Sequence, residues 1–154
     1  MVSAPADATS DVLPLPCGPA PDGYDSPFWE ELAVGRLVLP RCGSCRAWRP
    51  PGHPICPGCW SFDVRWQEVR PVGSVFSWIR SHRDFMEELD VRAPYDTVLV
   101  ALDDAPIRLL GLLVDGTGEP PAIGDRVTGT IEHPANAAWP ILRWTCAASP
   151  EGRA

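Results

Sequence analysis

The spacing of hydrophobic and polar positions is irregular at the proline-rich start of the chain and becomes helical only afterwards. Residues 1–24 are rich in Pro, Ala, Asp and Gly and have neither a helical nor a strand period, which predicts a flexible tail. Residues 25–36 have Ser26 as an N-cap, Pro27 at the first helical position and Gly35 as a stop signal. One short N-terminal helix is therefore expected there.

A strand-like period governs the second half of the chain. Apolar runs occupy five segments, which are residues 66–82, 95–103, 107–115, 126–133 and 139–146. In the first segment two sets are expected on opposite faces, namely Val75, Ser77 and Ile79 against Phe76, Trp78, Arg80 and His82. The second and third segments are apolar at nearly every position, which predicts burial on both faces.

Five consecutive strands with short connections and no long helix predict a mainly β protein. An antiparallel OB-fold barrel over residues 66–147 is the five-stranded solution of this size, and an SH3-like barrel is the competing one. Residues 37–65 lie between the helix and the barrel and are expected to form a small unit of their own. Residues 148–154 are expected to be a second tail.

Composition and charge exclude several classes of protein. Hydrophobic residues are 45% and charged residues 21% of the 154 residues, as in a globular protein. We see no secretory signal and no membrane-spanning run, so a cytoplasmic location without a membrane partner is expected. The formal net charge is −7, yet residues 36–70 hold six arginines and two acidic residues. We call this segment the basic island.

The basic island contains two CxxC pairs with the spacing C-x₂-C-x₁₀-C-x₂-C. In a reducing compartment such pairs are metal ligands more often than disulfides. The predicted ligands of one structural zinc ion are Cys42, Cys45, Cys56 and Cys59. Four sulfur ligands leave the ion no open position for substrate, and His53 is superfluous as a ligand. The first alternative to zinc is a rubredoxin-like iron site, and the second is a pair of disulfides.

Several motifs in a fixed order carry a family resemblance over residues 26–146. They are FWEELAVGRLVLPRC, the two CxxC pairs, WQEVRPVGSVFSW, APYDTVLVALDDAPIRLLGLLVD and AIGDRV. This order resembles the acyl-CoA-associated proteins with a rubredoxin-like zinc ribbon and an OB fold, labelled domain of unknown function number thirty-five. The four cysteines match the zinc positions of that family. Arg46 and Trp60 depart from it, because glycine or another small residue often follows each knuckle.

The resemblance implies an accessory subunit of a thiolase-like enzyme. In such assemblies the thiolase-like chain carries the nucleophilic cysteine, and the small protein shapes the complex and helps to accommodate a CoA-linked substrate. The chemistry ranges from acetoacetyl-CoA and hydroxymethylglutaryl-CoA synthesis to carbon–carbon cleavage of steroid side-chain thioesters. Acyl-CoA is thus expected as a ligand, and no activity is expected of the chain alone.

Two groups of residues are candidates for these contacts. CoA phosphates favour arginine, and adenine favours a flat surface, which selects the cluster Trp78, Arg80, His82 and Arg83. In the alternative, purely structural interpretation, Trp78 is part of the core and the arginines are ordinary solvated charges. A partner interface is expected on the helix and ribbon, at Phe28, Trp29, Arg46, Trp48 and Arg49.

Two other functions stay open. Zinc ribbons and OB barrels also bind single-stranded nucleic acid, which the net charge of −7 and the absence of lysine oppose. A rubredoxin-like iron redox protein is the other. No catalytic constellation is evident, since Cys17 and Cys146 lack an obvious base. The carboxylate pairs Glu87–Glu88 and Asp103–Asp104 are expected to be solvated loop charges.

Overall fold

The computed structural model describes residues 18–49, 51–84, 91–114, 118–135 and 137–147. Its elements are α1 (Ser26–Ala33), β1 (Val38–Cys42), β2 (Val64–Glu68), β3 (Val72–Ser81), β4 (Tyr95–Leu102), β5 (Arg108–Leu113), β6 (Arg126–Glu132) and β7 (Ile141–Cys146). Residues 1–17 and 148–154 of the predicted tails lie outside the described residues, as do Cys17, Glu87 and Glu88. Within the described part, no helix is long and apolar enough to cross a membrane.

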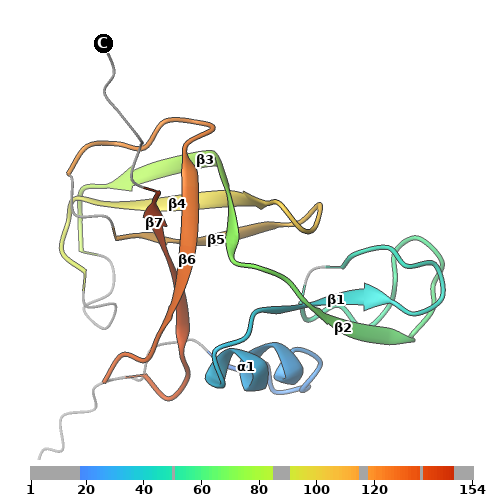
Figure 1. The fold of residues 1–154 in the computed structure, drawn as a ribbon. Coiled ribbons are helices and arrows are strands. Elements are labelled where there is room, and N and C mark those ends of the chain that lie inside the picture. The colour runs from blue at the N-terminus through green and yellow to red at the C-terminus, as the bar shows by residue number, and fades with distance from the viewer. Residues whose placement is uncertain (1–17, 50, 85–90, 115–117, 136, 148–154) are drawn as a thin grey trace, which may run out of the picture.

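The strands form a small two-stranded sheet beside a closed barrel (Figure 1). β1 and β2 pair antiparallel, and the barrel has the neighbour order β3-β4-β5-β7-β6, closed by pairing of β6 with β3. Neighbouring barrel strands are antiparallel except β5 and β7, which are parallel. The predicted mainly β fold with one short helix and a five-stranded barrel is confirmed.

The barrel interior is filled by alternate strand positions and one large aromatic residue. Val98 and Val100 of β4 are fully buried, and so is Trp144 of β7. Two glycines make room for the indole. A Cβ at Gly111 would lie 2.8 Å from the Trp144 ring, and one at Gly129 would lie 3.1 Å from it. Both positions therefore exclude larger residues by contact.

The helix and the ribbon share one core with the barrel. Leu32 of α1, Leu37 just before β1 and Leu39 within β1 are buried in the same cluster as Val75 and Val98 of the barrel. The small unit thus contributes apolar side chains to the larger one. We infer that burial of this shared surface holds the two parts together.

The predicted first barrel strand, residues 66–82, differs from the structure in two ways. It is two strands, because β2 ends at Glu68 and pairs with β1, and β3 begins at Val72. A bulge between Val75 and Ser77 then shifts the alternation. As a result Val75 and Trp78 both pack in the core, whereas Ile79 is 65% exposed.

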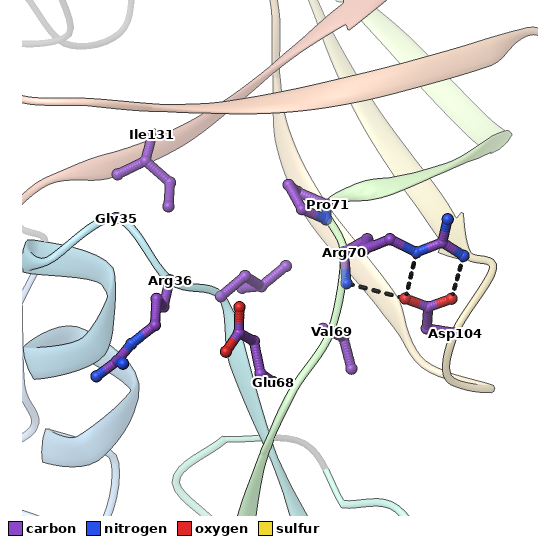
Figure 2. A pocket seen from close by; sticks show the side chains of 9 residues that line it. Gly35, Arg36, Glu68, Val69, Arg70, Pro71, Asp104 and Ile131 are labelled. Atoms are coloured by element: carbon purple, nitrogen blue, oxygen red, sulfur yellow. Dashed lines mark hydrogen bonds and ion pairs between the residues drawn. The ribbon is translucent and has the colours of Figure 1, made fainter.

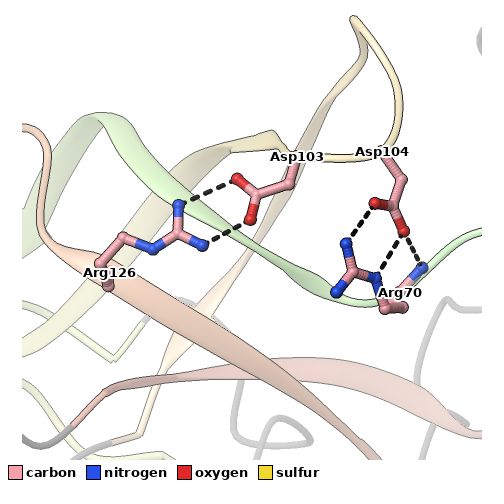
Figure 3. Close-up of polar contacts among 4 residues, drawn as sticks. All are labelled: Arg70, Asp103, Asp104 and Arg126. Carbon is pink, nitrogen blue, oxygen red and sulfur yellow. Dashed lines mark hydrogen bonds and ion pairs between the residues drawn. The ribbon is translucent and has the colours of Figure 1, made fainter.

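Two arginine–aspartate pairs join the barrel strands to the β4–β5 turn (Figure 3). Arg70 donates to Asp104 through Nε at 3.0 Å and Nη2 at 2.6 Å, and its backbone N–H donates at 3.0 Å. Arg126 binds both oxygens of Asp103. The two acids were expected to be solvated loop charges; they are exposed in the turn, but each is also held in an ion pair, which the sequence did not predict. They fix the connection between β2 and β3 and the start of β6.

These pairs make the stability of the fold depend on pH. The side chain and then the backbone N–H of Arg70 lower the pKa of Asp104 to about 2. Its contribution is therefore present above the ordinary Asp pKa of about 3.9 and is lost as pH falls through about 2. We expect Asp104→Asn to lower the urea midpoint at pH 7, with the difference from wild type narrowing toward pH 2. Glu119→Gln, at an exposed acid, is the control. A difference that stays constant over this range would contradict the assignment.

Candidate metal centre and subunit surfaces

The fold brings the sulfur atoms of all four ribbon cysteines to one point. The Sγ atoms of Cys42, Cys45, Cys56 and Cys59 lie within 4.8 Å of one another. The Sγ–Sγ distances are 3.5 Å between Cys42 and Cys59 and 3.6 Å between Cys45 and Cys56. Cys42 and Cys56 are buried, whereas Cys45 and Cys59 lie toward solvent. The cluster therefore closes the outer end of the ribbon.

These distances fit one central ion. Zinc–thiolate bonds of about 2.3 Å place tetrahedral sulfur atoms about 3.8 Å apart. A disulfide would need about 2.05 Å, far less than the 3.5 and 3.6 Å found. A four-sulfur donor set binds zinc or iron in preference to harder cations. Such a shell is closed, so an ion there would hold structure and would not activate a substrate.

The electrostatics of the cluster require a cation. The backbone N–H of Cys45 lowers the pKa of Cys42 to about 6, and the N–H of Gly58 lowers the pKa of Cys56. Cys59 is different. Although the N–H of Ser61 favours its thiolate, the neighbouring sulfurs of Cys45 and Cys42 raise its pKa to about 12. A metal ion at the centre would compensate the charge of ionised sulfurs placed this close together.

Each knuckle closes with an ordinary side chain where glycine is common. The N–H of Arg46 donates to the Cys42 carbonyl at 3.0 Å, and that of Trp60 donates to the Cys56 carbonyl at 2.8 Å. Arg46 has φ 64° and Trp60 has φ 61°, in the left-handed region that favours glycine. The departure from the family pattern therefore leaves the turn intact but strains its backbone.

The predicted interface residues of the ribbon lie in different environments. Arg46 is exposed, and Arg41 places its guanidinium 5.3 Å from the ring centre of the half-buried Trp48. Arg49 is only 1% exposed. Its side chain packs inside the ribbon in the isolated chain, so its expected place at an interface stays a prediction. Phe28 and Trp29 pack partly against the core and contact each other edge to face.

The predicted CoA cluster is brought together only in part. Trp78 packs against the core, as the purely structural interpretation predicts. Arg80 donates to both carboxylate oxygens of Asp96, at 2.8 and 2.7 Å, and both side chains are largely buried. His82 and Arg83 are exposed at the end of β3. Sequence reasoning missed Asp96, because only the register of β3 against β4 places it opposite Arg80.

A cleft of about 350 Å³ separates the helix and ribbon from the barrel (Figure 2). Arg36 and Glu68 line it on the ribbon side, and Ile131 lines it on the barrel side. Arg70 and Asp104 also line it and are paired with each other. Arg36 is engaged by Glu31. The basic groups of this cleft are therefore already occupied by acids of the same chain.

Part of the outer face of the barrel, on β3, β4 and β5, is largely apolar and partly exposed. Leu99 and Leu110 are cross-strand neighbours there, as are Thr97 and Leu112, next to Ile79. Leu110 is 70% exposed. A groove of about 300 Å³ continues from Leu110 toward the helix and is lined also by Phe28, Trp29, Leu32, Ile141 and Leu142. The expectation that β4 and β5 are buried on both faces is wrong for the single chain.

Comparisons with known proteins agree with this architecture. Family models for ChsH2 match its rubredoxin-like zinc ribbon domain over residues 29–65 and its C-terminal OB-fold domain over residues 66–132. The solved "Ltp2-ChsH2(DUF35) aldolase" superposes with a TM-score of 0.73 and 30% identity, covering 84% of this chain and 98% of that chain. The chain is thus a zinc-ribbon and OB-fold protein. It belongs to the DUF35 family, in the group of ChsH2.

Two further relatives are more distant or only partly covered. A DUF35 protein of unknown function from Sulfolobus solfataricus has the same fold, with a TM-score of 0.55 and 17% identity over 84% of this chain and 87% of that chain. A probable enoyl-CoA hydratase alpha subunit from Thermomonospora curvata is 38% identical over 81 residues, which are 52% of this chain. Our chain spans only 25% of the length of that curated relative.

Removal of one sulfur ligand tests the metal centre. We expect wild-type protein to contain one zinc ion per chain by elemental analysis. Cys45→Ser should lose the metal and make the ribbon sensitive to protease, because metal binding contributes on the order of 10 kcal/mol to such folds. Cys146→Ser, in β7, should keep it. A red protein with charge-transfer absorption would instead indicate iron.

Relief of the strained knuckle should stabilise the ribbon. Trp60 is 77% exposed and has a positive φ, so Trp60→Gly loses little packing and removes backbone strain. We expect stabilisation by about 1 kcal/mol in chemical unfolding of the metal-loaded protein. Arg65→Gly, in the neighbouring strand β2, should destabilise the protein. Loss of stability in Trp60→Gly would show that the indole itself supports the fold.

Proposed function

We propose that this protein is a non-catalytic accessory subunit that assembles with a thiolase-like enzyme acting on CoA thioesters. The observation that carries the proposal is the uncovered apolar face around Leu110 and Ile79, which are 70% and 65% exposed. An antiparallel sheet that faces water normally alternates apolar and polar residues. Contiguous apolar residues on an outer face are typical of a protein interface.

The comparisons support an enzyme as the partner. The solved relative that this chain covers to 98% is titled an aldolase of Ltp2 and ChsH2. The partly covered relative is named an enoyl-CoA hydratase subunit, which concerns CoA thioesters. Carbon–carbon bond cleavage of the retro-aldol type on an acyl-CoA is therefore the reaction that we assign to the assembly. This chain would shape the complex, and its partner would carry the nucleophile.

The pairing of three aspartates with arginines favours a non-catalytic role for this chain. Asp96, Asp103 and Asp104 each accept hydrogen bonds from an arginine, which fixes their positions. The paired guanidiniums also lower the pKa of Asp103 and of Asp104. A general base needs a free carboxylate near the substrate. For acyl-CoA contact we propose the exposed His82 and Arg83 beside Arg80, with Trp78 as the core residue that supports β3.

A second candidate function is binding of single-stranded nucleic acid. It is favoured by Trp60 and Phe62, which are 77% and 68% exposed on the arginine-rich ribbon and could stack on bases. The net charge of −7 opposes it. A filter assay across a salt series separates the two, because tight and steeply salt-dependent DNA binding would favour this candidate over the subunit role.

A charge placed on the apolar face tests the proposed assembly. Co-expressed with a thiolase-like protein encoded beside it, the wild-type chain should co-purify. Leu110→Glu should weaken the complex at least tenfold by calorimetry, because a buried unpaired carboxylate opposes binding. Thr130→Glu, at an exposed position of β6, is the control. Unchanged association of Leu110→Glu, or acyl-CoA turnover by the isolated chain, would overturn the proposal.

A further inference from the structure

A small cavity in the ribbon holds a buried arginine. Arg49 is 1% exposed and belongs to the largest fully buried side chains. Its backbone N–H donates to the Pro40 carbonyl at 2.9 Å. The backbone of Trp48 forms an isolated antiparallel β-bridge with Arg41 of β1. The chain at Trp48 and Arg49 is therefore held along β1. This fixes the guanidinium inside the ribbon.

The guanidinium of Arg49 lacks the carboxylate that other deeply placed arginines have. Within the described residues, Nη1 donates to the Pro54 carbonyl at a long 3.4 Å, and Nε is buried without an acceptor. By contrast, Arg80 binds both oxygens of Asp96, and Arg143 lies 2.8 Å from Glu132. A buried charge is strongly destabilising unless an anion accompanies it.

The cavity beside Arg49 is small and has aromatic walls. Its volume is about 100 Å³, and its lining includes Tyr24, His53, Pro54, Phe62, Val64 and Trp66 but no acidic residue. Sites for drug-sized ligands begin at about 300 Å³. The cavity is therefore too small for CoA or a nucleotide. Its aromatic walls suit methylene groups, and Tyr24 and His53 are lining residues with polar side-chain atoms.

We infer that this cavity binds a single carboxylate on a short alkyl stem, with Arg49 as the donor. The planar fork of a guanidinium matches the two oxygens of a carboxylate. A phosphate is bulkier and carries more charge than one guanidinium compensates. The carboxylate comes either from an Asp or Glu side chain of a partner polypeptide or from a free small acid. Neither source depends on which enzyme the protein assembles with.

A purely structural role for Arg49 makes the opposite prediction for stability. If its charge balanced the nearby metal–thiolate cluster, Arg49→Met would destabilise the metal-loaded protein. If Arg49 is a binding site for an anion and is unliganded, Arg49→Met removes an uncompensated buried charge. The thermal stability of the variant is then equal to or higher than that of wild type. Thermal unfolding without added carboxylate separates the two cases. A clear loss of Tm in Arg49→Met, with no loss in the exposed Arg65→Met, would overturn the proposal.

Binding is tested with small probes on the full metal-loaded chain. Sodium propionate, titrated at constant ionic strength, should shift the Arg49 Nε–Hε resonance saturably in the millimolar range, and neutral propionamide should not. Arg49→Met should weaken propionate binding at least tenfold, measured on neighbouring backbone amides, and Arg65→Met should not. N-acetylglutamate N-methylamide, a side-chain mimic, distinguishes the sources. If this mimic binds as tightly as propionate does, the carboxylate comes from a protein partner. If the mimic binds much more weakly than propionate, the carboxylate comes from a free acid.

A second variant tests the cavity with Arg49 left in place. Phe62 lines the cavity and is 68% exposed, so Phe62→Glu leaves Arg49 in place and offers it an internal carboxylate. This variant should lose propionate binding and gain thermal stability. Phe62→Gln, which has the same shape without the charge, should keep the binding. No saturable shift with propionate, or an equal shift with sodium chloride, would overturn the proposal.

Discussion

The mutual repulsion of four thiolates is the constraint on which the ribbon depends. Their sulfur atoms lie within 4.8 Å of one another, and the proximity of Cys42 and Cys45 raises the pKa of Cys59 to about 12. Only a cation at the centre lets all four sulfurs be charged at once. The segment between the knuckles has little core of its own, so the ion supplies what hydrophobic burial cannot.

The ribbon in turn depends on the barrel for its other end. Leu37 and Leu39 are buried in one cluster with barrel residues, and Arg70 binds Asp104 of the β4–β5 turn. Metal at one end and shared core at the other thus hold a thin sheet in a fixed position. Such an arrangement presents the ribbon surface rigidly, as a binding site requires.

Features without a local explanation are concentrated on surfaces that another molecule could cover. Leu110 and Ile79 leave an apolar sheet face in water, and Trp60 is exposed on a strained turn. Arg49 is buried without an acid. Each of these costs stability in the isolated chain. Their common explanation, under the function proposed above, is that another molecule covers these surfaces.

The sequence alone determined the short helix, the four clustered cysteines and the five barrel strands, because Pro27 and Gly35 at the helix ends, CxxC spacing and strand periodicity are local signals. The predicted N-cap Ser26 is instead the first helical residue, and Asp25 precedes it without a side-chain cap. It did not determine the pair Arg80–Asp96, which depends on strand register, or the pair Arg70–Asp104, which depends on how two connections meet. Nor did it distinguish the buried Arg49 from the exposed Arg46. A bulge at Phe76 shifted one predicted face. Contacts between residues distant in the chain arise from packing in three dimensions, so only the tertiary structure decided which charges are paired and which faces are bare.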